Sequence, residues 1–371
     1  MEWTDTSRNR TLPVEVWYPA TENYRDQDLN PATQDKFTPV WLAALDDNAE
    51  LATQTAVRDA QKEDGATPLV LLIHGWAGFR QEATFIGPHL ASHGFTVVSP
   101  DIISSTYPDV DAFFNSQEPL GKPAAMDAHL EGIAKFRQGD VPFLIDAAEQ
   151  YLDVDTAKVG ITGASFGGWT SLMAPGVDAR IAASVPMCPA GGRAPAQPKN
   201  HSPLIDMLSM KWHKPVPTLM LTASRDSLLP LDGQFDLLRR IPAANKKMVI
   251  LADSDHNHFV DDIDAGQAWL KDYVERVARL FPDGPGEWPI AASLVVPQEE
   301  LCPGDHAHTA WRGLTLAHMD AHIRSNNDAA AFLEGPIDLI LGEQGIATNT
   351  IAGCPVIERS RNGQREIVAA Q

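Results

Sequence analysis

The chain has few cysteines and few basic residues, and it lacks both a long apolar stretch and an apolar amino-terminal core. Only three of its 371 residues are cysteine, so at most one internal disulfide is possible. No apolar stretch approaches the roughly 20 residues that a membrane-spanning helix needs. The first ten residues are polar and lack the apolar core of a signal peptide, so we expect no secretion signal within them. Basic residues are also scarce, 29 against 49 acidic residues. A formal net charge of −20 repels phosphate backbones and anionic lipid surfaces, so we expect neither nucleic acid nor membrane partners.

The cysteines fall into two kinds of surroundings. Cys188 follows a run typical of a strand end, and a small buried thiol is the expected reading. Cys302 and Cys354 lie in the irregular carboxy-terminal part, where a bond between them would close a loop of about 52 residues. Such a bond would contribute roughly 4 kcal/mol in the chain-entropy model. It would also favour a secreted or periplasmic location, which the sequence otherwise leaves open.

Strands and helices alternate along most of the chain. The aliphatic run 69–73 predicts a buried parallel strand, and further strands are expected at 12–18, 95–99, 159–162, 181–185, 218–222 and 248–251. Helices are expected at 81–92, 126–136, 141–151, 231–239 and 265–280. This alternation predicts an α/β fold with a mostly parallel sheet covered on both faces. We expect a catalytic domain over 1–281, with 282–371 forming a loop insertion, a final helix near 308–333 and an extension packed on the same domain.

The most informative segment is Gly163-Ala164-Ser165-Phe166-Gly167. A strand leads into it and a helix leaves it, which is the context in which a sharp turn lifts a serine above the sheet. Glycines on both sides allow a crowded backbone that a side chain would block. Ser165 is therefore the candidate nucleophile.

A serine nucleophile needs a base and an acid that orients the base. Asp226 follows the strand 218–222, and His256 follows the strand 248–251. Taken singly, each is an ordinary loop residue, but three strand ends supply Ser165, Asp226 and His256 in the order typical of α/β-hydrolases. We predict that these three residues form the catalytic triad.

The remaining site residues are predicted from their neighbours. The developing oxyanion needs two backbone donors, for which we expect the N–H groups of Phe166 and of Trp76, in the loop after the strand 69–73. The side chains of Trp76, Trp169 and His258 are expected to line the substrate pocket.

Other polar clusters allow different readings. Asp253, Asp255, His256 and His258 could be drawn as a metal site, and His318 and His322 have the spacing of paired ligands on a helix. Neither set is complete in sequence, so we expect no metal and no cofactor. The aspartates 261, 262 and 264 are expected to form a solvated helix amino terminus.

Several motifs together resemble one group of enzymes. These are 5–10 with 12–19, His74-Gly75, 163–168 and 256–259, over a region of about 5–281. They are similar to the platelet-activating-factor acetylhydrolase and dienelactone-hydrolase-like group of α/β-hydrolases. The resemblance implies that Ser165, Asp226 and His256 carry catalysis. Dienelactone hydrolases proper use cysteine as nucleophile, so the serine favours the esterase branch, and Ala164 replaces a common histidine.

The sequence thus predicts a serine carboxylic-ester hydrolase. Because 188–214 is too short for a large helical lid, an open cleft suits short-acyl or bulky esters, including aromatic or polymeric ones. The alternatives are a peptidase or amidase of the same fold, and a binding protein that keeps the fold without turnover. The sequence does not fix the oligomeric state.

Overall fold

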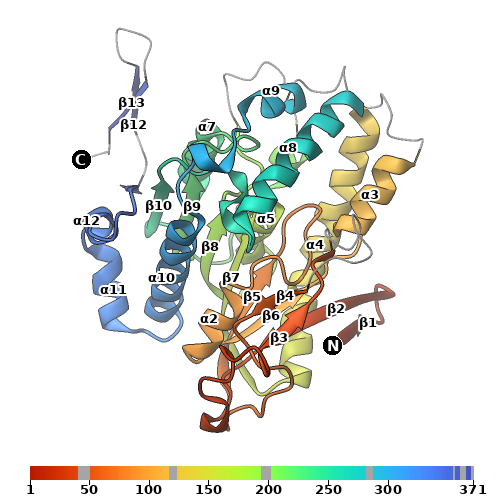
Figure 1. Ribbon diagram of the computed structural model, residues 1–371, viewed down its shortest axis with the longest axis vertical. Coiled ribbons are helices and arrows are strands. Elements are labelled where there is room, and N and C mark those ends of the chain that lie inside the picture. Colours follow the sequence, from red (N-terminus) through yellow and green to blue (C-terminus); the bar gives the residue numbers. More distant parts are fainter. Residues whose placement is uncertain are drawn as a thin grey trace.

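The computed structural model describes residues 1–40, 51–116, 123–193, 202–280, 287–353, 356–359 and 365–368. Within them a nine-stranded sheet runs through the molecule in the order β1-β2-β6-β5-β7-β8-β9-β10-β11 (Figure 1). The strands from β6 to β10 in this order are parallel, whereas β1, β2 and β11 are antiparallel to their neighbours. The strands are β1 (Glu2–Asp5), β2 (Arg10–Trp17), β5 (Thr67–Ile73), β6 (Thr96–Pro100), β7 (Val154–Ala164), β8 (Ile181–Met187), β9 (Thr218–Ala223), β10 (Lys246–Leu251) and β11 (Thr348–Ala352).

Both faces of the sheet are buried, as the unbroken aliphatic run of β5 predicts. Leu69, Leu71 and Ile73 pack into one hydrophobic cluster, whereas Val70 and Leu72 pack into another on the opposite face. The first cluster also holds side chains of α4 (Pro123–Tyr151), α5 (Phe166–Met173) and α7 (Leu231–Arg240). The second holds side chains of α2 (Gly87–Ser92), α8 (Ile263–Leu280) and α10 (Gly304–His322). The predicted fold class is therefore confirmed.

The other elements lie in connections and at the ends. Two small hairpins pair β3 (Asp35–Phe37) with β4 (Ala52–Gln54), and β12 (Val356–Arg359) with β13 (Arg365–Val368). The remaining helices and turns are η1 (Glu22–Tyr24), α3 (Tyr107–Asn115), η2 (Ala174–Gly176), α6 (Pro203–Met207), η3 (His256–Phe259), α9 (Glu287–Leu294), η4 (Gln298–Glu300), α11 (Asn327–Glu334) and α12 (Ile337–Gly342). No helix in the described ranges is both long and apolar enough to cross a bilayer.

The predicted break between helices 126–136 and 141–151 is wrong. The structure has one 29-residue helix, α4, which continues through Gly139 and Pro142. Buried charges lie at the expected break: the Asp140 carboxylate accepts hydrogen bonds from Arg8 and Arg10 at 2.8 and 2.9 Å. These long-range bonds stabilise a helical turn that its local sequence disfavours.

The predicted helix 81–92 is shorter than expected, because α2 begins at Gly87. The Asp261 carboxylate accepts hydrogen bonds from the Thr84 and Phe85 N–H groups, both at distances of 2.8–2.9 Å. Pro88 then occupies the first turn, where a missing N–H costs nothing. Asp261 thus binds a neighbouring segment and is not the solvated aspartate that we expect from the sequence. Asp262 and Asp264 are exposed.

The predicted final helix 308–333 is two helices. The first ends at His322, and Ser325 then takes a left-handed φ of 59°. Asn326 caps the second helix, since its side chain accepts from the N–H groups of Asp328 and Ala329.

The segment after 281 contributes to the sheet and to the site. Its strand β11 pairs with β10, and Ile351 packs into the same cluster as Met248. Near the site, Trp311 of α10 donates from Nε1 to the backbone oxygen of His258 at 2.9 Å. The division at 281 stays a prediction, but the two parts share one core.

Candidate active site

Ser165 lies on the predicted turn between β7 and α5. Its φ of 57° and ψ of −114° are rarely adopted by a residue with a side chain, and such strain is typical of functional sites. The flanking glycines are required for close packing. A Cβ at Gly163 would lie 2.1 Å from the backbone oxygen of Ile73, and one at Gly167 would lie 1.9 Å from the same atom. The Ser165 side chain remains partly exposed at the end of the sheet.

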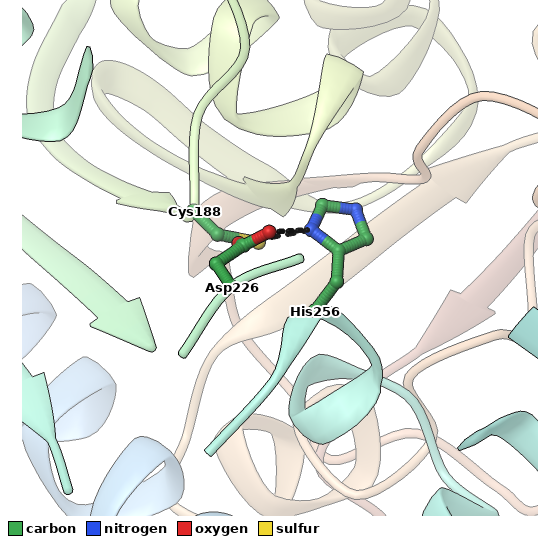
Figure 2. Close-up of side chains that lie close together, drawn as sticks. All are labelled: Cys188, Asp226 and His256. Atoms are coloured by element: carbon green, nitrogen blue, oxygen red, sulfur yellow. Dashed lines mark hydrogen bonds and ion pairs between the residues drawn. The ribbon is translucent and has the colours of Figure 1, made fainter. Parts of the chain in front are cut away.

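Asp226 and His256 meet at the carboxyl ends of β9 and β10 (Figure 2). His256 Nδ1 lies 3.1 Å from Asp226 Oδ1 and 3.0 Å from Oδ2. A carboxylate accepts, so Nδ1 carries the proton and Nε2 of the neutral ring has a free lone pair. The Asp226 carboxylate is itself fixed by the N–H groups of Leu228 and Leu229, at 3.0 and 2.7 Å.

The charge of His256 depends on the same neighbours. Burial alone would lower the pKa of the ring, but the Asp226 carboxylate, and then the adjacent Cys188 thiol, raise the pKa of His256 well above its ordinary 6.5. Asp226 therefore stabilises an imidazolium, the form that this ring takes after it accepts a proton.

Asp255 joins the two loops that carry Asp226 and His256. Its Oδ1 accepts from the backbone N–H of Ser227 at 2.7 Å and from that of His256 at 2.6 Å. Its Oδ2 accepts from Gln267 of α8 at 2.8 Å. The sequence indicates Asp255 only as a candidate metal ligand, although an aspartate just before a short helical turn is a usual cap.

One cleft brings Ser165 and His256 together with Trp76, one of the predicted wall residues. It has a volume of about 200 Å³, and its walls are largely apolar and aromatic. Trp76 lies 6.2 Å from Tyr273 between ring centroids, and Tyr273 stacks on Trp269 at 4.7 Å. The other side chains that line the cleft include Phe37, Phe79, Leu228, Phe259 and Leu270, with the carboxyl groups of Glu82 and Asp261.

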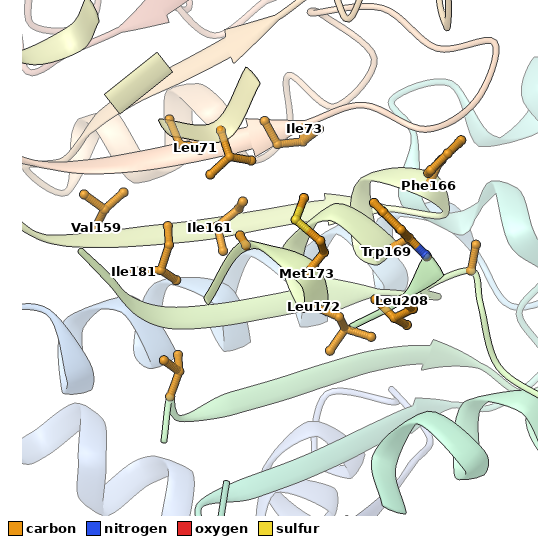
Figure 3. Packing of buried hydrophobic residues seen from close by; sticks show 14 of the residues in the cluster. Leu71, Ile73, Val159, Ile161, Phe166, Trp169, Leu172, Met173, Ile181 and Leu208 are labelled. Carbon is orange, nitrogen blue, oxygen red and sulfur yellow. The ribbon is translucent and has the colours of Figure 1, made fainter. Parts of the chain in front are cut away.

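The structure places Trp169 and His258 outside this cleft, contrary to expectation. Trp169 is fully buried in the core beside Phe166 and Leu172 (Figure 3), and its Nε1 donates to the backbone oxygen of Leu204. A helix position that faces the sheet is a core position, and the sequence alone did not show which way residue 169 points.

His258 is also fully buried and uses both ring nitrogens. Nδ1 accepts from the Asp255 N–H at 3.1 Å, and Nε2 lies 3.2 Å from the backbone oxygen of Cys302. This histidine therefore fixes the loop that carries His256 and does not face the cleft.

The predicted oxyanion donors lie on the two segments that meet at Ser165. Phe166 is the first residue of α5, and N–H groups of a first turn have no acceptor within their own helix. Trp76 lines the same cleft from the loop after β5. This loop packs on the turn, since a Cβ at Gly75 would lie 3.4 Å from Ser165 Cβ.

The structure also bears on the cysteines and on the possible metal ligands. Cys188 is buried as predicted, and burial raises the pKa of its thiol. Among described residues, the only group of three possible metal ligands within 4.8 Å is Cys188, Asp226 and His256, which differs from the clusters considered in the sequence. Cys302 forms no disulfide within the described ranges. Cys354 lies outside them, so the predicted pair stays a prediction.

In a comparison with protein families, residues 55–281 match the Dienelactone hydrolase family. The chain belongs to this family. As a dienelactone hydrolase family member it is a hydrolytic enzyme of the α/β-hydrolase superfamily, as predicted. The finer likeness to platelet-activating-factor acetylhydrolases stays a prediction.

A solved structure is similar to this family member along most of its length. It is a ferulic acid esterase from Streptomyces cinnamoneus, with a TM-score of 0.56 and 21% sequence identity. The alignment covers 88% of this chain and 89% of that one, and it supports the fold. A search of curated proteins finds no match.

Proposed function

We propose that this protein is a serine carboxylic-ester hydrolase that acts through Ser165, His256 and Asp226. The observation that carries the proposal is the pairing of a strained serine turn with a His256–Asp226 hydrogen bond at one cleft. Each residue type fits its role in acyl transfer.

In the proposed mechanism, Ser165 Oγ attacks the ester carbonyl carbon while His256 Nε2 takes the hydroxyl proton. The carbonyl π electrons move to oxygen, where the N–H groups of Phe166 and Trp76 would stabilise the negative charge. The tetrahedral intermediate expels the alcohol, which takes the proton from His256, and an acyl-serine remains. Water then attacks the acyl-serine while His256 takes a proton from the water and the same two N–H groups stabilise the negative charge. The proton passes from His256 to Ser165 Oγ as the acid leaves.

The walls of the cleft suggest the substrate class. Trp76, Trp269 and Tyr273 offer ring faces and edges, which favour a flat aromatic or otherwise bulky group over a long flexible chain. The similar solved structure is named a ferulic acid esterase, so hydroxycinnamoyl esters belong among the substrates to test. Polymeric aromatic esters are a second group.

The test compares ester and amide substrates on one enzyme. Purified protein is assayed with 4-nitrophenyl acetate, butyrate and decanoate, with a methyl hydroxycinnamate and with 4-nitroanilides, alongside Ser165→Ala. We expect turnover of short-acyl and aromatic esters, weak turnover of decanoate and loss of activity in Ser165→Ala. Preferential anilide cleavage would support the amidase alternative. Absence of all turnover, with no fluorophosphonate label on Ser165, would support a binding protein.

A further inference from the structure

Two ionisable side chains hold the loop after β5 from opposite sides, the fully buried Arg137 and the half-buried Glu82. The loop contains His74, Gly75 and Trp76, and it packs directly on the turn at Ser165. Charged side chains are seldom fully buried, because leaving water is costly unless each charge is paired or hydrogen-bonded. Their position beside the candidate active site therefore requires an explanation.

Arg137 of α4 binds the carbonyl side of the loop. Its side chain is fully buried, and its two terminal nitrogens donate to the backbone oxygens of His74 at 2.9 Å and of Gly75 at 3.0 Å. The same guanidinium lies 4.4 Å from the ring centroid of Phe166. Arg137 thus contacts both segments that are proposed to supply oxyanion donors.

Glu82 binds the amide side of the same peptide chain. Its Oε1 accepts from the Gly75 N–H at 2.7 Å, and the carboxyl group lines the cleft with Ser165. A Cβ at Gly78 would lie 2.0 Å from Glu82 Oε2, so glycine at this position leaves room for the carboxyl group. The opposite charge of Glu82 partly offsets the burial that lowers the pKa of Arg137 to about 9.

We infer that Glu82 and Arg137 are positioning residues for the oxyanion hole. With its N–H held by Glu82 and its carbonyl held by Arg137, Gly75 has little freedom to rotate, and the peptide that joins it to Trp76 is fixed. Donors that are aligned before the reaction need no reorganisation in the transition state, which is where their effect on rate arises. This inference rests on the proposed function.

The Glu82 series tests the inference. Glu82→Ala removes the acceptor, and we expect kcat to fall about 30- to 100-fold with KM nearly unchanged, because loss of one aligned donor costs about 10²–10³ in rate. Glu82→Gln keeps an oxygen that accepts from the Gly75 N–H, so kcat should recover to within about fivefold of wild type. Arg137→Lys, which retains charge but loses the two-armed contact, should lower kcat about tenfold.

The matched control is Glu15→Ala. Glu15 is a buried glutamate of β2 that pairs with Arg58 at 2.7 Å, away from the cleft. The Glu15→Ala substitution should lower the unfolding temperature and leave kcat unchanged. Wild-type kcat in Glu82→Ala, an equal loss of kcat in Glu15→Ala, or no recovery in Glu82→Gln would each overturn the inference. Activity that persists in Ser165→Ala would instead overturn the proposed function, and the positioning role with it.

Discussion

Ser165 and His256 act on one proton in the proposed mechanism, so their contributions to rate are not independent. We expect Ser165→Ala and His256→Ala each to reduce kcat by several orders of magnitude, and the double variant to be scarcely slower than either. Steady-state assays with a 4-nitrophenyl ester measure this. Losses that multiply in the double variant would contradict a shared role. The His258→Ala variant is assayed for comparison with His256→Ala, because His258 is buried and does not line the cleft.

The pKa of His256 gives the direction of the pH dependence. The base must be neutral to accept the serine proton, and Asp226 raises the pKa of the ring well above 6.5. We therefore expect kcat/KM to rise with pH through an apparent pKa above 6.5, with maximum activity at alkaline pH. Asp226→Asn removes the negative charge and should lower this apparent pKa as well as the rate. An unchanged midpoint in Asp226→Asn would argue against the assigned pair.

Asp255 connects the two loops and does not line the cleft. Asp255→Ala should leave the Ser227 and His256 N–H groups without their acceptor, which costs about 1–3 kcal/mol for each buried group. We expect a lower unfolding temperature together with at least a tenfold lower kcat, because the His256 loop is no longer tied to the Asp226 loop. A variant as unstable as expected but fully active would show that Asp255 serves stability alone.

The residues that the sequence revealed differ in kind from those it did not. Ser165, Asp226 and His256 follow strand ends, so the alternation of elements alone brings them to one edge of the sheet. Arg137, and the bond from Asp255 to Ser227, act through contacts between segments that no local pattern links. Arg137, for instance, binds a carbonyl 63 residues away. The orientation of Trp169 toward the core was likewise not readable, because every residue of its short helix is buried.

At the level of elements, strands were predicted better than helix ends. The aliphatic composition of β5 is enough to predict this strand. In contrast, the start of α2 and the continuity of α4 depend on distant side chains, since Asp261 binds the backbone before α2 and Arg8 binds Asp140 inside α4. Tertiary contacts of this kind override local propensity.

Strand β11 offers a test of how far the edge of the sheet matters to the site. Ile351 is buried in the core, so Ile351→Ala should reduce the free energy of unfolding by about 2–4 kcal/mol. Because β11 does not line the cleft, kcat/KM should be unchanged. Urea unfolding and an esterase assay check both statements. Leu339→Ala on α12 is the control, since Leu339 is 63% exposed and its loss should cost less than about 0.5 kcal/mol.

At the level of the whole molecule, the predicted bond between Cys302 and Cys354 remains to be tested. If it forms, reduction should lower the unfolding temperature, by an amount that reflects roughly 4 kcal/mol in the chain-entropy model. Thiol titration of the unreduced, unfolded protein should find one free thiol, that of Cys188. Three free thiols in protein prepared under oxidising conditions would contradict the pairing and remove the argument for a secreted or periplasmic location.

The two edges of the sheet are formed by β1, near residue 1, and β11, near residue 352. Nine strands at a spacing of roughly 4.8 Å place these edges about 38 Å apart. A circular permutant that joins the two edge strands would thus need a linker of at least about 11 extended residues, laid across a face that helices already cover. A split-protein design avoids this linker. The chain is cut in an exposed loop, and each of the two fragments retains its own edge strand.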